Sequence, residues 1–69
     1  MKKNRDIEEA TSTNRLGQMW MVEDLKTGVF VSANVIGLCR GKISLVRLQS
    51  GENAGEVRDD KNFRLMEKL

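Results

Sequence analysis

The pattern of apolar and polar positions is clearest between residues 27 and 48, which contain the longest apolar and β-branched run in the chain. Three residues, Arg40, Gly41 and Lys42, interrupt this run near its middle. Two apolar strands separated by so short a polar interruption are typical of a β-hairpin. The stretch therefore predicts two antiparallel strands joined by a tight turn at residues 40–42.

Alternation within the hairpin indicates which side chains face the core. In the first strand every second residue from Val29 to Val35 is apolar, so this set is expected to point inward and to leave Phe30 near the surface or a groove. In the second strand Leu48 falls on the outer face unless a β-bulge shifts the register. The core predicted from strict alternation is Val29, Val31, Ala33, Val35, Ile43 and Leu45.

Residues 19–25 predict a further strand, which precedes the hairpin. Its alternation leaves two inner faces open, one with Met19, Met21 and Leu25 and one with Trp20 and Val22. A turn is expected to begin at residue 24, where an Asp-Leu-Lys-Thr-Gly segment ends in a glycine that can adopt positive φ.

The segment after the hairpin predicts a loop at residues 49–55, which contains Gly51 and Gly55. A short strand end is expected at residues 56–58. Residues 59–69 fit two structures. A helix capped by Asp59 or Asp60 would place Phe63, Met66 and Leu69 at three-residue spacing. A strand would instead place Phe63 and Leu65 on one face. We favour a closing strand, because a short twisted sheet otherwise leaves an unprotected edge.

The N-terminal residues 1–18 hold few large apolar side chains. Apart from Met1 these are Ile7 and Leu16, which bury too little apolar surface to offset the entropy of ordering the segment. The sequence therefore predicts a flexible arm at residues 1–18 and one small domain at residues 19–69. Four or five short strands with tight turns predict a mainly β fold, a small antiparallel SH3-like or Sm-like barrel.

The amino-acid composition indicates the cellular environment of the protein. The chain has 69 residues, one cysteine and no histidine, and 39% of its residues are hydrophobic. A single cysteine cannot form an internal disulfide, so we expect a reducing, cytoplasmic environment with Cys39 as a buried or half-buried strand thiol. No window approaches the roughly 20 apolar residues of a membrane-spanning helix, so we expect no membrane partner.

The sequence lacks the residues that usually carry out catalysis or bind metals. Without histidine and with one cysteine, the common acid–base, nucleophilic and zinc arrangements cannot be assembled. In the carboxylate pairs Glu23–Asp24 and Asp59–Asp60 the two side chains are not expected to act together, because neighbours along a strand point to opposite faces. We expect these acids to be solvated. We therefore expect no enzyme activity, no cofactor and no metal.

Charge is unevenly distributed despite a formal net charge of only +2. Between residues 25 and 51 there is no acidic residue but there are four basic ones, Lys26, Arg40, Lys42 and Arg47. Arg40 and Lys42 either solvate an exposed turn or form an edge that faces an anion.

Part of the chain also resembles a known family. The matching residues are Asp24, Thr27-Gly28-Val29, Val31-x-Ala33-x-Val35-Ile36-Gly37 and Gly41-Lys42-Ile43-x-Leu45. Residues 24–51 look like the SH3-like homology domain of the endocytic adaptor Sla, which also occurs in bacterial proteins. The resemblance implies a protein-interaction barrel without catalysis. The same strand and glycine-turn pattern is also similar to Sm-like regulators, which bind RNA or RNA-handling proteins.

These observations support two functional hypotheses. The leading one is a non-enzymatic adaptor or regulatory module that binds another protein through a sheet edge or the groove beside Phe30, with self-association as a further outcome. The alternative is RNA or single-stranded DNA binding through the basic hairpin, residues 40–47. Arg40 and Lys42 would then contact phosphates beside Arg47, and Phe30 or Trp20 would stack on a base. For Trp20 itself, core packing is favoured over an exposed binding surface.

Overall fold

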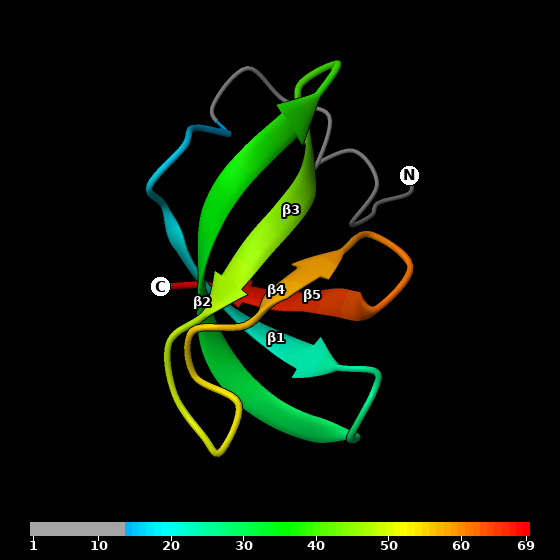
Figure 1. The fold of residues 1–69 in the computed structure, drawn as a ribbon. Helices are drawn as coiled ribbons and strands as arrows, with labels where there is room; N and C mark the ends of the chain where they lie inside the picture. Colours follow the sequence, from blue (N-terminus) through cyan, green and yellow to red (C-terminus); the bar gives the residue numbers. More distant parts are fainter. Residues whose placement is uncertain (1–13) are drawn as a thin grey trace.

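The computed structural model of the chain describes residues 14–69, which form one five-stranded antiparallel sheet and contain no helix (Figure 1). The strand order is β4-β3-β2-β1-β5. The strands are β1 (Met19–Asp24), β2 (Val29–Cys39), β3 (Lys42–Leu48), β4 (Val57–Asp59) and β5 (Phe63–Lys68). The mainly β prediction is therefore confirmed. In the described residues β4 and β5 do not pair with each other, so the sheet is open between them.

Both predicted turns are present. In the β1–β2 turn the carbonyl of Asp24 accepts hydrogen bonds from the backbone N–H groups of Thr27 and Gly28, at 3.1 and 2.6 Å. Gly28 has φ of 80°, as the sequence predicted. The β2–β3 turn has two central residues with positive φ, Arg40 at 55° and Gly41 at 81°, which matches the twist of a two-residue hairpin.

The long strand β2 holds the sheet together because it pairs along both edges. Its first half pairs with β1 and its second half with β3, so the sheet bends along this strand (Figure 1). The β2–β3 register shifts on both sides of Gly37, which lies opposite Leu45. A Cβ atom at Gly37 would lie 3.0 Å from the Cβ atom of Leu45, so the irregular pairing is tightest where glycine stands.

The core consists of ten buried apolar side chains. β1 contributes Trp20 and Val22, which settles the face that alternation left open. The full set is Trp20, Val22, Val31, Ala33, Val35, Ile43, Val46, Leu48, Phe63 and Leu65. Four of the six core residues predicted in the hairpin are among them.

Two predicted core residues are wrong. Val29 is 52% exposed because it lies at the start of β2, beyond the side chains that cover Val31. Leu45 is 36% exposed because the register shift at Gly37 moves it to the outer face and brings Val46 and Leu48 inward. The bulge that would bury Leu48 is therefore present.

The C-terminal segment is the predicted closing strand and not a helix. β5 pairs with β1, and its alternation buries Phe63 and Leu65 while exposing Arg64 and Met66. Covering this side of β1 completes the core around Val22, which lies opposite Leu65.

The predicted flexible arm is too long at its C-terminal end. Gly17 N donates to the carbonyl of Val35, and Val35 N donates to the carbonyl of Gln18, both at 2.8 Å. Asn14 is buried, and its Nδ2 donates to the carbonyl of Gly41 at 2.7 Å. Residues 14–18 thus extend the sheet and brace the hairpin turn. The rest of the predicted arm, residues 1–13, lies outside the described residues.

Candidate functional site

A buried ion pair connects two strands that are not neighbours in the sheet. Arg58 of β4 donates from Nε to Oδ1 of Asp24 at 2.9 Å and from Nη2 to Oδ2 at 3.2 Å. Asp24, at the end of β1, is 2% exposed and Arg58 is 5% exposed. Two other strands separate β1 from β4 in the strand order, so the pair forms across the interior of a curled sheet. The expectation that Asp24 is a solvated acid is wrong.

The ion pair is supported on both sides. Asp24 Oδ1 also accepts the backbone N–H of Lys26 at 3.1 Å, and Arg58 Nη1 lies 2.9 Å from Oε1 of Glu56. The hydrogen bonds from Arg58 hold the pKa of Asp24 below its ordinary value, although burial acts in the opposite direction. The bonds to Asp24 likewise raise the pKa of Arg58. Asp24 therefore stays ionised and its oxygens are already engaged.

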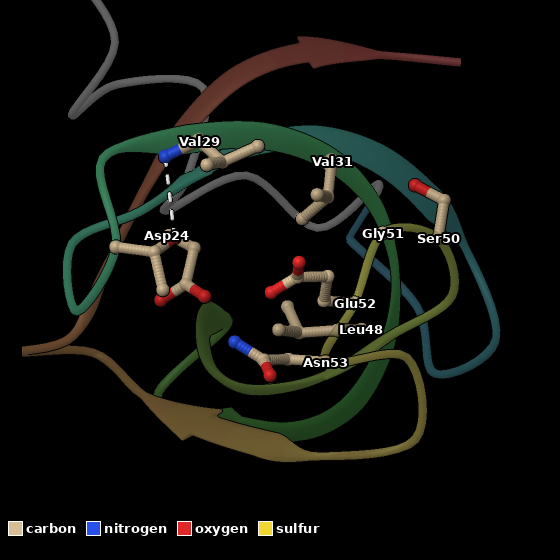
Figure 2. A pocket seen from close by; sticks show the side chains of 9 residues that line it. Asp24, Val29, Val31, Leu48, Ser50, Gly51, Glu52 and Asn53 are labelled. Carbon is tan, nitrogen blue, oxygen red and sulfur yellow. Dashed lines mark hydrogen bonds between the residues drawn. The ribbon is translucent and has the colours of Figure 1, made fainter.

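Beside this pair the curled sheet leaves an open cleft of about 360 Å³ (Figure 2). Its walls come from the β1–β2 turn, from Val29 and Val31 of β2, from Leu48 at the end of β3, and from residues 50–53 of the following loop. We call this the apolar cleft. The three aliphatic side chains give it an apolar surface, of which Val29 is the most exposed part.

The loop that forms one wall of the apolar cleft is fixed in place by hydrogen bonds. Gln49 N donates to the carbonyl of Ser32 at 2.8 Å, and Ser32 N donates to Oγ of Ser50 at 3.0 Å. Gly51 has φ of 85°, and a Cβ atom there would lie 3.0 Å from Cγ1 of Val31. The loop can approach β2 this closely because the residue at its contact point is glycine.

Two polar side chains from the same loop point into the apolar cleft. Figure 2 shows the carboxylate of Glu52 and the amide of Asn53 directed toward the space between Val31, Leu48 and Asp24. None of the residues that line the cleft is Lys or Arg, and no residue of the described range 14–69 forms an ion pair with Glu52. Since Arg58 neutralises Asp24, Glu52 leaves the cleft with a negative charge.

The aromatic residues predicted at the site lie elsewhere. Trp20 is 4% exposed and its Nε1 donates to Oε1 of Gln18 at 3.3 Å, so it packs in the core and offers no surface for stacking. Phe30 is 57% exposed, but alternation places it on the face of β2 opposite Val29 and Val31. Its neighbour there is Glu23, which pairs with Arg64. The apolar cleft is therefore not a groove beside Phe30.

The predicted basic residues divide between the two ends of the hairpin. Arg40 and Lys42 lie at its tip and line a second cleft of about 450 Å³. Arg47 lies near the other end of β3, opposite Asn34. Phe30 lies near the start of β2 and Arg40 directly after its end, ten positions later, a contour of about 30 Å for an extended strand. The structure thus brings Arg40 and Lys42 together but separates them from Arg47 and Phe30.

Cys39 is exposed, so the prediction of a buried or half-buried thiol is wrong. β1 pairs only with the first half of β2, and the hairpin tip projects beyond β1 and β5 (Figure 1). The end of β2 where Cys39 lies is therefore outside the region that the core covers.

Sequence reasoning missed Arg58, Glu52 and Asn53. Arg58 carries one signal, since it is the only cation in the acidic stretch of residues 56–60. For Glu52 the signal is its position directly after Gly51, at the end of the acid-free window. Neither pattern shows that the two residues lie near Asp24, because that proximity depends on the curl of the sheet.

Residues 14–69 contain no group of three or more His, Cys, Asp or Glu side chains arranged to hold a metal ion. The same residues form no helix of the length and apolarity needed to cross a bilayer.

Comparisons with protein-family models, with curated proteins and with solved structures find no match for this chain. The interpretation of the apolar cleft therefore depends on its own geometry and charge.

Proposed function

We propose that this chain is a non-enzymatic adaptor or regulatory module that binds a segment of another protein in the apolar cleft. The observation that carries the proposal is the preformed cleft itself, in which an exposed Val29 adjoins the buried Val31 and Leu48. Cavities that bind ligands are typically about 300–1,000 Å³, mostly apolar, with a few polar groups that orient the ligand. At about 360 Å³ this cleft has room for one or a few side chains of a partner.

The chemistry of the cleft supports binding over catalysis. Asp24 already accepts hydrogen bonds from Arg58 and has a lowered pKa, which makes it a weak base. The other polar groups in the cleft are Thr27, Ser50, Glu52 and Asn53, and no histidine exists in the chain to activate a hydroxyl.

The resemblance to the Sla homology domain supports the same function, since it implies a protein-interaction barrel. We also propose that the curled sheet is an SH3-like or Sm-like barrel, an interpretation supported by the Asp24–Arg58 pair, which links β1 to β4 across the interior. The single cysteine supports a cytoplasmic location.

RNA or single-stranded DNA binding has weaker support. That hypothesis needs phosphate contacts and a stacking platform on one surface, whereas Trp20 is buried and Phe30 lies far from the hairpin tip. Arg40 and Lys42 remain a pair of adjacent cations. Two phosphate contacts, one from each of these cations, would give log affinity a slope of about −1.4 against log salt, which an electrophoretic shift series would detect.

A pair of matched variants tests the proposed function. Val29→Asp places a charge in the apolar cleft, and Val57→Asp makes the same change at an exposed position of β4, 44% exposed and outside the cleft. Tagged wild-type and variant chains are expressed in the source cells, and bound proteins are quantified by mass spectrometry. We expect the proteins that bind the wild-type chain to bind Val57→Asp in similar amounts and not to bind Val29→Asp. An identical set of proteins bound to both variants would contradict the assignment of the cleft.

A further inference from the structure

We propose that the apolar cleft binds a partner segment through a Lys or Arg side chain, whose charged end pairs with Glu52. This inference deepens the proposed function and rests on it. It concerns the chemistry of the occupant, which the apolar walls alone do not specify.

The first argument is charge. Two carboxylates line the cleft, but Asp24 is neutralised by Arg58 at 2.9 Å, so Glu52 is the carboxylate left to attract a ligand. The lining residues include no cation, and Glu52 has no ion-pair partner within residues 14–69. A cationic ligand therefore meets a complementary charge, and an anionic one meets repulsion.

The second argument is shape. Figure 2 shows the Glu52 carboxylate directed into the space bordered by Val31 and Leu48. Lys and Arg side chains have the matching form, because their aliphatic stems pack on apolar surface while the charged end reaches a polar group. Figure 2 shows the amide of Asn53 with its nitrogen on the side toward Asp24, so Glu52 is the acceptor that such a charged end would meet.

The third argument is preorganisation. The loop that carries Glu52 is held by hydrogen bonds from Gln49 to Ser32, from Ser32 to Ser50 and from Gly55 to Leu48. A carboxylate on a fixed loop loses less conformational entropy when it binds a cation than one on a mobile segment does. Two of the three aliphatic walls, Val31 and Leu48, are core residues and are equally fixed.

The test uses random peptides displayed on phage, selected separately on wild type, Glu52→Lys and Val29→Asn, which makes the cleft wall polar without adding a charge. Peptides selected on wild type should be enriched in Lys or Arg next to apolar residues, and selection on Glu52→Lys should shift the enrichment toward Asp and Glu. The affinity of a wild-type-selected peptide should fall about 5-fold with Glu52→Gln and about 10-fold or more with Glu52→Lys. Glu67→Lys, an exposed residue of β5, is the matched charge control and should change affinity less than about 2-fold.

The outcomes separate this inference from the proposed function. If selected peptides lose affinity with Val29→Asn but show neither a basic excess nor sensitivity to Glu52→Gln, the cleft binds segments and the cationic inference is wrong. If no selected peptide depends on Val29, both are wrong. If wild type forms a concentration-dependent dimer in sedimentation that Glu52→Gln abolishes, the occupant is a second copy, which also overturns the inference. Thermal unfolding followed by Trp20 fluorescence verifies that each variant is folded.

Discussion

Removing the guanidinium of Arg58 is the most informative perturbation of this fold. In Arg58→Met the aliphatic stem remains, but Asp24 keeps its charge at 2% exposure without its main partner. Breaking a buried ion pair in this way typically costs about 3–5 kcal/mol. We expect about 3 kcal/mol, the lower end of that range, because Asp24 also lines the apolar cleft and can gain some solvation there.

A double-mutant cycle separates the loss of packing from the uncompensated charge. Asp24→Asn removes the charge but keeps an oxygen that can accept the backbone N–H of Lys26. The double variant Asp24→Asn/Arg58→Met should therefore recover about 1–2 kcal/mol of the stability that Arg58→Met loses. The free energy of unfolding is measured by urea denaturation at pH 7, with the fluorescence of the buried Trp20 as the signal.

The assay needs a stabilising background. At about 0.05–0.15 kcal/mol per residue, a domain of this size has roughly 3–10 kcal/mol of stability, so Arg58→Met alone can shift much of the population to the unfolded state. A fixed concentration of sulfate raises all four stabilities and keeps every folded baseline measurable. A loss below about 1 kcal/mol for Arg58→Met, or a double variant equal to the sum of the two single changes, would refute the reasoning.

Three further measurements test other parts of the structure. The folded-state pKa of Asp24 lies below its ordinary value of 3.8. The ionised carboxylate therefore contributes fully to stability above pH 3.8, and this contribution disappears as the pH falls through the folded-state pKa. In an acid titration of the free energy of unfolding, Asp24→Asn should lose less stability than wild type below about pH 4. Trp20→Ala should cost roughly 3–5 kcal/mol in urea denaturation followed by circular dichroism, and an unchanged melting temperature would contradict its place in the core. Gly37→Ala should cost about 1–3 kcal/mol because its Cβ would press on Leu45, whereas Gly28→Ala meets no atom and should cost about 1–2 kcal/mol through its φ of 80° alone. Asparagine, which tolerates positive φ, should therefore be better accepted than alanine at Gly28 but not at Gly37.

Local sequence signals predicted the strands and turns well. The Arg40–Gly41 turn and the positive φ of Gly28 each follow from chemistry within a few residues, whereas the closing strand at Phe63 was chosen over a helix because the sheet needed an edge covered. Such features are recoverable from one sequence because turn geometry and side-chain alternation are properties of neighbouring positions.

Strict alternation failed where the backbone departs from regular pairing. Leu45 and Val46 exchange faces because the β2–β3 register shifts around Gly37, and the only sign of this in the sequence was the position of Leu48. Val29 does share a face with Val31, but the sheet opens at that end and leaves it exposed. The pattern shows which side a residue faces and not whether another element covers that side.

The candidate site was mostly unpredictable for a different reason. Asp24, Glu52 and Arg58 belong to three separate connections or strands, and only the curl of the sheet brings them to one place. The residues that composition singled out, Phe30 and Arg40, lie on other parts of the molecule. A site assembled from distant positions requires the tertiary structure before its charges can be interpreted.

The pairing of β1 with β5 also determines the order in which this chain can fold. Three pairs of strands that follow each other in the chain, β1–β2, β2–β3 and β3–β4, each close a short loop. In the β1–β5 pair, by contrast, Asp24 lies opposite Phe63 and Trp20 opposite Lys68, positions roughly forty or more residues apart. The conformational entropy lost on closing a loop grows with the length of the loop. We therefore expect β5 to dock late in folding, and until it does Val22 lacks its cross-strand neighbour Leu65. The folding chain is therefore expected to expose this side of β1 until β5 docks and covers it.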